Sequence, residues 1–446
     1  MQANCLVPHD FEIFMNIAYI QKFYKPRFNK PPYRAALGLF LFFLLVPALS
    51  LTPDQPIPVL RVGISQRIME ESRLARFGPG FEQALVYAFC ATKGYSPQWT
   101  VTENQQEALR LLGERQLDLV VGYVGARLRG ELLSSPVYYR GRLLELLAPT
   151  DEAADASLPV KLDTRSLRLW QPFLPEGTQT QAEAQGQTRE EQGHRWHWRR
   201  DTVELNAELA AFWQARVGKD DMLLARLDDL HFGFVPPHFD LYDIRDLRRV
   251  LGERLPEHGG LIAAAAAQVV ELDPLLFTAV IFQESRLDPQ TVSHTGVRGI
   301  MQLTTRTARF LRVDRLDPEQ ALQGGARYLH YLWENLAQYQ LEPWDRWFFA
   351  LASFNQGQRR VEGAMELSRK LGGSGRTWVE LKKVLPLLAQ PSYAAMVGQG
   401  PCRGGEAVRF VEKVRWYYHI LRGLVILDRP EAQYLTPLLL SAVIRD

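Results

Sequence analysis

One acidic residue, Glu284, stands at the end of an apolar run and precedes a turn rich in glycine and polar residues. Asp273 and Pro274 are a helix-start signal, with Asp as the N-cap and Pro at the first helical position. Glu284 should therefore lie near the C-terminus of this helix. It shares a helix face with Val280 and Leu276, the face expected to meet the core. The sequence thus predicts a carboxyl group against an apolar wall.

Such surroundings change what the carboxyl group of Glu284 can do. Burial among apolar groups disfavours the charged form, and the negative end of the helix dipole acts in the same direction, so both effects should raise its pKa. A carboxylic acid that stays protonated near neutral pH can act as a general acid in glycosidic cleavage. The alternative for a Glu at a helix end is a side chain turned outward into water.

Three further blocks follow Glu284 along the chain and supply turn glycines and polar residues. Glycines let the backbone approach a ligand closely. The blocks contain Ser293, Gly296, Gly299, Met301 and Gln302, then Ala352, Phe354, Asn355 and Gly357, and finally Glu406, Ala407, Phe410 and Val411. Together with the Glu284-Ser285 pair, and in this order, they resemble the soluble lytic transglycosylase domain over about 170 residues, one domain's length.

The resemblance implies an all-α, lysozyme-like domain over residues 256–425. It implies that Glu284 protonates the oxygen between N-acetylmuramic acid and N-acetylglucosamine, then takes a proton from the muramic C6 hydroxyl, which gives a 1,6-anhydro end. It also implies that peptidoglycan glycan strands are the substrate and that no metal or cofactor is used. The implied substrate-contacting residues are Ser293, Gly299, Met301, Gln302, Phe354 and Asn355.

One departure from the family pattern concerns the residue before Asn355. Family members usually have Tyr there, whose phenol can hydrogen-bond the catalytic carboxyl group, whereas Phe354 offers only an apolar face. No second carboxylate is convincing, because Asp288 and Asp345 stand where turn, surface or structural roles are expected. Two alternatives remain open: a hydrolytic muramidase that uses water, and a non-catalytic protein that binds or senses the cell wall.

Residues 55–250 show a different pattern, in which strands and helices alternate as in a parallel α/β sheet. The predicted strands are 59–65, 98–102 and 117–124, with helices at 80–94 and 105–116. This part resembles the first lobe of solute-binding family 3 proteins and implies a muropeptide or amino-acid ligand, with Arg127 at the position of a carboxylate clamp. An exposed helix-start Arg is the alternative.

The expected second lobe of that domain is shortened, because residues 150–201 are polar and show little strand pattern. We expect His194 and His197 to belong to a solvated or interfacial segment, since two histidines make a poor metal site. Trp196 and Trp198 could stack on sugars or pack, and packing is favoured. The junction that follows resembles the F family of membrane-bound lytic murein transglycosylases, which joins these two kinds of domain.

The N-terminal residues resemble an export signal. A basic flank precedes an apolar run over 35–51, and small residues at its end suit cleavage after Ser50. Residues 1–50 are thus a predicted signal sequence or, if uncleaved, an N-terminal anchor. The expected location is the periplasm, peripheral to the outer membrane. A net charge of +2 argues against a nucleic-acid partner. Residues 426–446 are expected to form a C-terminal tail.

Overall fold

The structure is a computed structural model of the 446-residue chain. It describes residues 57–75, 77–125, 128, 130–140, 143–147, 161–174, 179–182, 193–216, 222–236, 241–269 and 271–443. The predicted signal sequence, residues 1–50, and the predicted ligand clamp Arg127 lie outside the described residues.

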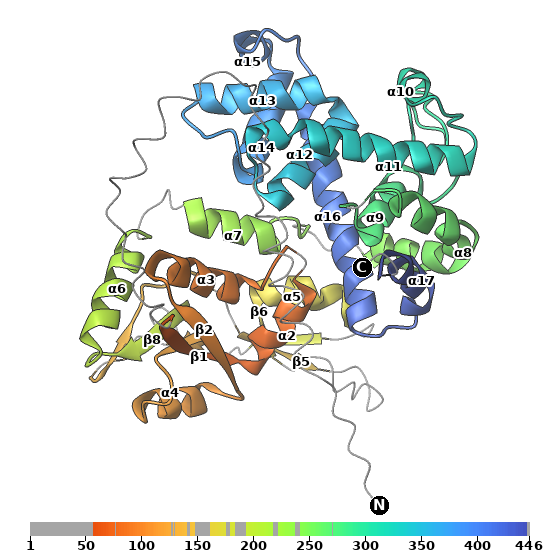
Figure 1. Ribbon diagram of the computed structural model, residues 1–446. Helices are drawn as coiled ribbons and strands as arrows, with labels where there is room; N and C mark the ends of the chain where they lie inside the picture. The colour runs from red at the N-terminus through yellow and green to blue at the C-terminus, as the bar shows by residue number, and fades with distance from the viewer. Residues whose placement is uncertain are drawn as a thin grey trace, which may run out of the picture. The chain divides into compact units, whose positions relative to one another are not determined.

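The first part of the described chain is an α/β layer built on a five-stranded sheet of order β2-β1-β3-β8-β4 (Figure 1). β1 pairs in parallel with both β2 and β3, which confirms the predicted parallel arrangement. The elements here are β1 Val59–Ser65, α2 Gln66–Leu74, α3 Phe81–Lys93, β2 Ser96–Thr102, α4 Gln105–Gly113, β3 Leu119–Gly125, β4 Leu132–Ser134, β8 Gly193–Arg199 and α6 Val203–Gln214. The predicted strands and helices of this part are all present.

The strand β8 corrects the prediction for the segment with His194 and His197. It is buried along its whole length, antiparallel to β3 on one side and to β4 on the other. Polar side chains of β8 find partners inside the protein: His194 Nδ1 lies 3.1 Å from a carboxylate oxygen of Glu82, and His197 Nδ1 lies 2.9 Å from the hydroxyl of Ser134. Burial lowers the pKa of His197 to about 4. Trp196 packs as predicted, stacked on Phe212 with ring centroids 5.7 Å apart.

A second, three-stranded antiparallel sheet of order β6-β5-β7 accompanies the first. Its strands and the elements that follow it are short, in keeping with the shortened lobe that the sequence predicts. They are β5 Leu143–Leu147, β6 Lys161–Asp163, α5 Thr164–Trp170, η2 Gln171–Phe173 and β7 Gln179–Ala182, with α7 Met222–Phe232 leading to the helical part.

The helical part surrounds α16, whose residues are buried on nearly every side, as expected for a central helix (Figure 1). α9 and α12 both pack against it. The helices are α8 Leu241–Ala266, α9 Pro274–Ser285, α10 Thr305–Leu311, α11 Pro318–Asn335, η3 Ala337–Tyr339, α12 Pro343–Gln356, α13 Gln358–Lys370, α14 Trp378–Val384, η4 Leu385–Ala389, α15 Pro391–Met396, α16 Gly404–Ile426 and α17 Ala432–Val443. The predicted all-α class is confirmed.

Two predicted boundaries of the helical part differ from those in the structure. α8 is one 26-residue helix that runs across the expected boundary between residues 250 and 256. Residues expected to be a tail form α17, which packs against α8. Leu435 and Leu438 are buried there because they lie three residues apart on one helix face.

The hydrophobic core of the helical part extends into residues from the α/β part. Phe77, Trp170 and Phe173 are buried in the same cluster as the residues of α9 and α16. Phe173 and His419 of α16 lie with ring centroids 5.4 Å apart. The two parts therefore share a packed core within residues 57–446. No helix among the described residues has the length and apolar character that a membrane span requires.

Candidate functional site

The helix α9 places Glu284 and begins as the sequence predicts. A carboxylate oxygen of Asp273 accepts hydrogen bonds from the backbone N–H groups of Leu275 at 2.7 Å and Leu276 at 3.3 Å. Pro274 takes the first helical position, where a missing N–H has no cost. The hydroxyl of Tyr418 from α16 also donates to Asp273. The start of α9 is therefore fixed both locally and by the central helix.

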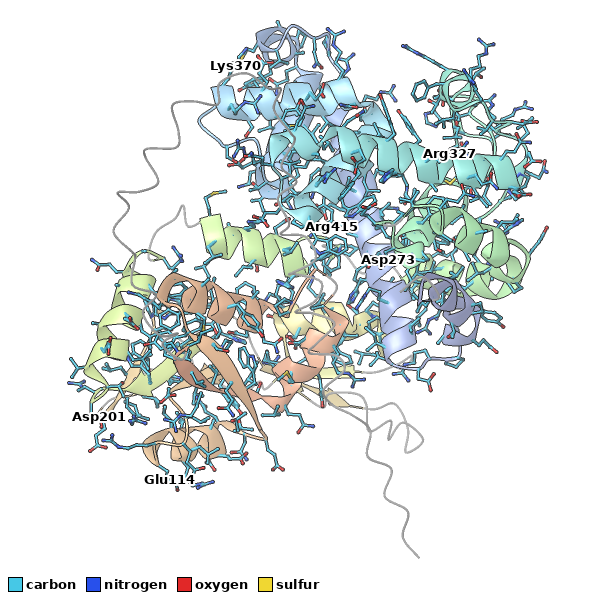
Figure 2. All side chains as sticks on the ribbon, viewed as in Figure 1. Glu114, Asp201, Asp273, Arg327, Lys370 and Arg415 are labelled. Atoms are coloured by element: carbon cyan, nitrogen blue, oxygen red, sulfur yellow. The ribbon has the colours of Figure 1, made fainter. Side chains whose placement is uncertain are left out.

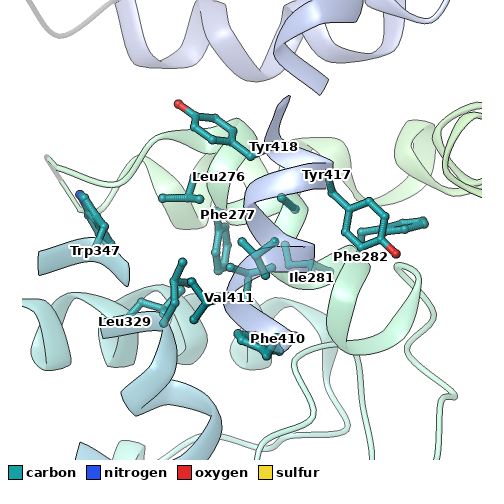
Figure 3. Close-up of a cluster of buried hydrophobic side chains, with 14 of the residues drawn as sticks. Leu276, Phe277, Ile281, Phe282, Leu329, Trp347, Phe410, Val411, Tyr417 and Tyr418 are labelled. Carbon is teal, nitrogen blue, oxygen red and sulfur yellow. The ribbon is translucent and has the colours of Figure 1, made fainter. Parts of the chain in front are cut away.

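Glu284 lies in the last turn of α9 and is half-buried. Val280 and Ile281, four and three residues before it, are fully buried. Figure 3 shows Ile281 in one cluster with Phe410 and Val411 of α16. Burial raises the pKa of Glu284 to about 8. No hydrogen bond or ion pair joins this carboxyl group to any residue that the structure describes, so its protonated form is favoured by desolvation alone.

The chain leaves α9 through two consecutive left-handed residues that the sequence does not reveal. Arg286 has φ +57° and Leu287 has φ +58°, a conformation that costs free energy for residues with side chains. Arg286 is held by a 3.0 Å hydrogen bond from its Nε to Asp246 of α8 and by one of 2.9 Å to the carbonyl of Phe282. Leu287 is fully buried. Tertiary contacts thus fix the turn that follows Glu284.

The loop after this turn folds back toward the end of α9. The hydroxyl of Thr291 donates to the carbonyl of Ser285 at 3.1 Å. The carbonyl of Thr291 accepts from the backbone N–H of Gly299 and from the side-chain amide of Gln302, both at 3.1 Å. The same amide nitrogen donates to the carbonyl of Gly299 at 2.8 Å. Through Thr291, these hydrogen bonds connect Gly299 and Gln302 with Ser285, the residue after Glu284.

Ser293 starts a tight turn inside this loop. Its Oγ accepts from the backbone N–H of Val297 at 3.0 Å and is 3.0 Å from the hydroxyl of Thr295. Val292 and Arg298 form an antiparallel bridge across the turn. Among the described residues, Ser293 makes hydrogen bonds only within this loop. The turn that the sequence allows for Ser293 is therefore present.

Met301 and Gly299 fix this loop through close contacts with neighbouring segments. Met301 is fully buried, and its side chain lies so close to Gly325 of α11 that a Cβ there would meet it at 2.4 Å. Its side chain therefore positions the loop and offers no exposed surface. Gly299 has φ +94°, and a Cβ at this position would meet the carbonyl oxygen of Arg315 at 2.1 Å.

These contacts predict that Gly299→Ala destabilises the protein by about 2 kcal/mol or more, because the added methyl group meets rigid backbone and an unfavourable φ. Gly296→Ala is the matched control. Its φ is +78°, but a Cβ there would meet nothing within 4 Å, so it should cost only about 1 kcal/mol. Urea unfolding of both variants measures the difference, and equal losses would contradict the close approach.

Phe354 and Asn355 lie in the last turn of α12. Asn355 is exposed, and its side-chain oxygen Oδ1 accepts from the side-chain amide of Gln356 at 3.2 Å. Phe354 stacks on Phe410 with centroids 6.5 Å apart and lies 5.7 Å from the ring of Tyr328. Through Phe410 it belongs to the cluster that packs against α9. Tyr328 could not be singled out from the sequence, because a Tyr in an amphipathic helix carries no signal of a binding site.

The other carboxylates near this region have structural roles. Asp345 is buried and not a surface residue: its oxygens accept from the backbone N–H of Trp378 at 2.8 Å and from Arg226 at 3.0 Å. Asp288 accepts from the N–H of Gln290 at 2.9 Å, the turn role expected for it. Within the described part of the chain, Glu284 is therefore the acidic group without a polar partner at this end of α9.

Several known proteins are similar to this chain in sequence. Residues 262–374 match the family model described as transglycosylase SLT domain. Membrane-bound lytic murein transglycosylase F 2 of Alkalilimnicola ehrlichii is 37% identical over 261 residues, which cover 58% of this chain and 56% of that protein. Membrane-bound lytic murein transglycosylase F of Pectobacterium atrosepticum is 36% identical over 248 residues, 55% of this chain and 50% of that protein.

The chain spans about half the length of the curated relatives it matches. A solved structure of an inactive mutant of lytic transglycosylase Slt from Pseudomonas aeruginosa aligns with 51% of this chain and 33% of its own, at 19% identity and a TM-score of 0.24. Residues 262–374 thus resemble the transglycosylase SLT domain, and the chain is similar in sequence to the membrane-bound lytic murein transglycosylase F proteins.

Proposed function

We propose that this protein is a peptidoglycan lytic transglycosylase that cleaves the β-1,4 bond between N-acetylmuramic acid and N-acetylglucosamine. The observation that carries the proposal is the pKa of Glu284, which burial raises to about 8, so that the acid is protonated near neutral pH. The matched domain and the names of the relatives support the same substrate. A single protonated carboxyl group suits this reaction, whereas most glycoside hydrolases use two carboxylates.

In the proposed reaction, Glu284 donates its proton to the glycosidic oxygen while the bond from that oxygen to C1 of the muramic residue breaks. The carboxylate then accepts the proton of the muramic C6 hydroxyl. The C6 oxygen bonds to C1, which closes the 1,6-anhydro ring without consuming water. The carboxyl group returns to its starting protonation state, so one group serves as acid and then as base.

The residues around Glu284 have proposed roles in holding the glycan strand. Gln302 has its amide nitrogen committed to backbone carbonyls, which leaves its side-chain oxygen to accept from a sugar hydroxyl. Asn355 is exposed and can donate. Ser293 and Gly299 shape the loop, and Phe354 supplies an apolar face. Because Phe354 replaces a phenol, Glu284 has no hydrogen-bond donor from this position.

Digestion of purified sacculi followed by mass analysis of the products tests the proposal. A lytic transglycosylase leaves a muramic end that is lighter than a hydrolysed end by one water. Products carrying the full mass of added water would identify a hydrolytic muramidase. An absence of soluble products from correctly folded protein would favour a protein that binds or senses the wall.

The pH dependence of the reaction provides a separate check. Because the acid form of Glu284 starts the reaction, kcat/KM should stay high to about pH 8 and then fall tenfold per pH unit. A Glu with its ordinary pKa of about 4.3 would already be ionised at neutral pH, and the same fall would begin near pH 4 to 5. A pH profile on soluble glycan strands distinguishes the two, and a fall centred near pH 5 would count against a buried acid.

The remaining parts of the proposal concern place and regulation. We propose a periplasmic location, peripheral to the outer membrane or anchored by the N-terminal segment.

A muropeptide or amino acid bound near Arg127 would regulate cleavage only through different affinities for two arrangements of the protein. Calorimetry with stem peptides, repeated on Arg127→Ala, tests this: equal heats from both proteins would remove Arg127 from any ligand site.

A further inference from the structure

Four aromatic side chains of the helical part form a continuous series, here called the aromatic row: Phe310 of α10, Tyr331 and Tyr328 of α11, and Phe354 of α12. Neighbouring ring centroids are 5.6 Å apart from Phe310 to Tyr331, 6.3 Å from Tyr331 to Tyr328, and 5.7 Å from Tyr328 to Phe354. Tyr328 and Tyr331 share a helix face because they are three residues apart. Rings from three helices therefore present one connected surface.

Exposure along the aromatic row increases away from the candidate site. At its inner end, Phe354 stacks on Phe410, which is buried in the cluster that holds α9. Tyr328 and Phe354 are half-buried, whereas Tyr331 is 45% exposed and Phe310 is 60% exposed. Single exposed apolar side chains are common, but a contiguous group of them is a candidate binding surface. The row therefore runs from the buried cluster that packs against α9 outward to solvent.

The polar groups along the aromatic row suit a carbohydrate more than a second protein surface. The hydroxyls of Tyr328 and Tyr331 form no hydrogen bond with any described residue, so both can donate to or accept from sugar hydroxyls. Burial raises the pKa of Tyr328, and the positive charge of Arg306 opposes that shift. Arg306 has no ion-pair partner in the part of the chain that the structure describes. A positive charge close enough to act on the Tyr328 hydroxyl suits a glycan that carries carboxylates.

We propose that the aromatic row is a glycan-binding platform that holds the peptidoglycan strand beyond the bond being cleaved. The inference rests on the proposed function, because continuity with the site of Glu284 identifies the occupant. The apolar faces of pyranose rings pack on aromatic rings, and the ring spacing of 5.6–6.3 Å is comparable to the advance of one sugar unit along an extended strand. The platform would make affinity depend on strand length.

Binding in a Glu284→Gln background tests the platform without cleavage. We expect Phe310→Ala combined with Tyr331→Ala to raise the dissociation constant for long glycan strands about ten- to a hundredfold. Fragments too short to reach both rings should bind unchanged. Tyr87→Ala is the matched control, because Tyr87 is also a 45% exposed tyrosine in an aromatic pair, 6.1 Å from Trp99, but lies on α3 of the α/β part. It should leave strand binding unchanged.

The outcomes separate this inference from the proposed function. If the wild-type chain cleaves strands and the double variant binds and cleaves them equally well, the platform is excluded and the function stands. If no strand is cleaved but Glu284→Gln still loses binding with the double variant, the platform stands and the function fails. If sedimentation shows instead that the double variant only dissociates a dimer, the row is a contact between copies of this chain, and the inference is overturned.

Discussion

Replacing Glu284 by Gln should reduce the cleavage of sacculi at least about 10³-fold, since one group acts as both acid and base. The same substitution should stabilise the protein at alkaline pH. Below about pH 4.5 the carboxyl group is protonated in both the folded and the unfolded chain, so it costs nothing. Between pH 4.5 and 8 the folded chain alone keeps the proton, and stability falls as pH rises.

Above pH 8 the folded wild type must bury a carboxylate without a polar partner, which Gln avoids. The gain from Glu284→Gln at pH 9 should be on the order of 5 kcal/mol, because the pKa of about 8 lies about 3.5 units above its value in the unfolded chain and each unit corresponds to about 1.4 kcal/mol. Urea unfolding at pH 4 and pH 9, beside a sacculus-clearing assay, measures both effects. Glu257→Gln is the control, because Glu257 is exposed on α8 and should change neither quantity.

Two results would remove Glu284 from the mechanism or from its buried setting. Clearing by Glu284→Gln at the rate of the wild type would exclude the residue as acid and base. An equal free energy of unfolding for both proteins at pH 9 would show that the carboxyl group is not desolvated. Because loss of activity is expected together with a gain in stability, unfolding cannot account for the inactive variant.

The second large effect concerns Arg415, a fully buried residue of α16 that joins the two parts of the chain (Figure 2). Its guanidinium group contacts carboxylate oxygens of Glu412 at 2.9 Å and Asp229 of α7 at 3.4 Å. It also donates to the carbonyls of Asp229 at 2.7 Å and Leu230 at 3.2 Å. Lys382 of α14 bonds the same Asp229 carboxylate.

Arg415→Met should lower the free energy of unfolding by about 3–5 kcal/mol, because it leaves buried carboxylates and carbonyls without their donor. Arg403→Met is the matched control at the exposed start of the same helix. Its ion pair with Glu406 is 3.3 Å long, but its side chain is 74% exposed, so the loss should stay below about 1 kcal/mol. Urea unfolding followed by tryptophan fluorescence measures both, and equal losses would contradict a structural role for the buried network.

Features whose signals lie in a few adjacent residues could be predicted from the sequence. Asp273 and Pro274 indicate the start of α9, because helix capping depends on a few adjacent residues. Helical spacing then fixes the face of Glu284, and apolar neighbours on that face predict its raised pKa. The parallel strands of the first part were predicted for the same reason, since each is a short β-branched run bounded by turns.

Features that depend on contacts between distant segments could be seen only in the folded chain. The strand β8 could not be predicted because its histidines and arginines look solvated until residues distant in the sequence pair with them, as Glu82 of α3 does with His194. The left-handed turn at Arg286 depends on Asp246, forty residues earlier in the chain. Likewise, Met301 is buried because it packs against Gly325 of α11, and Phe310 belongs to the aromatic row because it contacts Tyr331 of the same helix. Residue type and spacing do not specify these contacts.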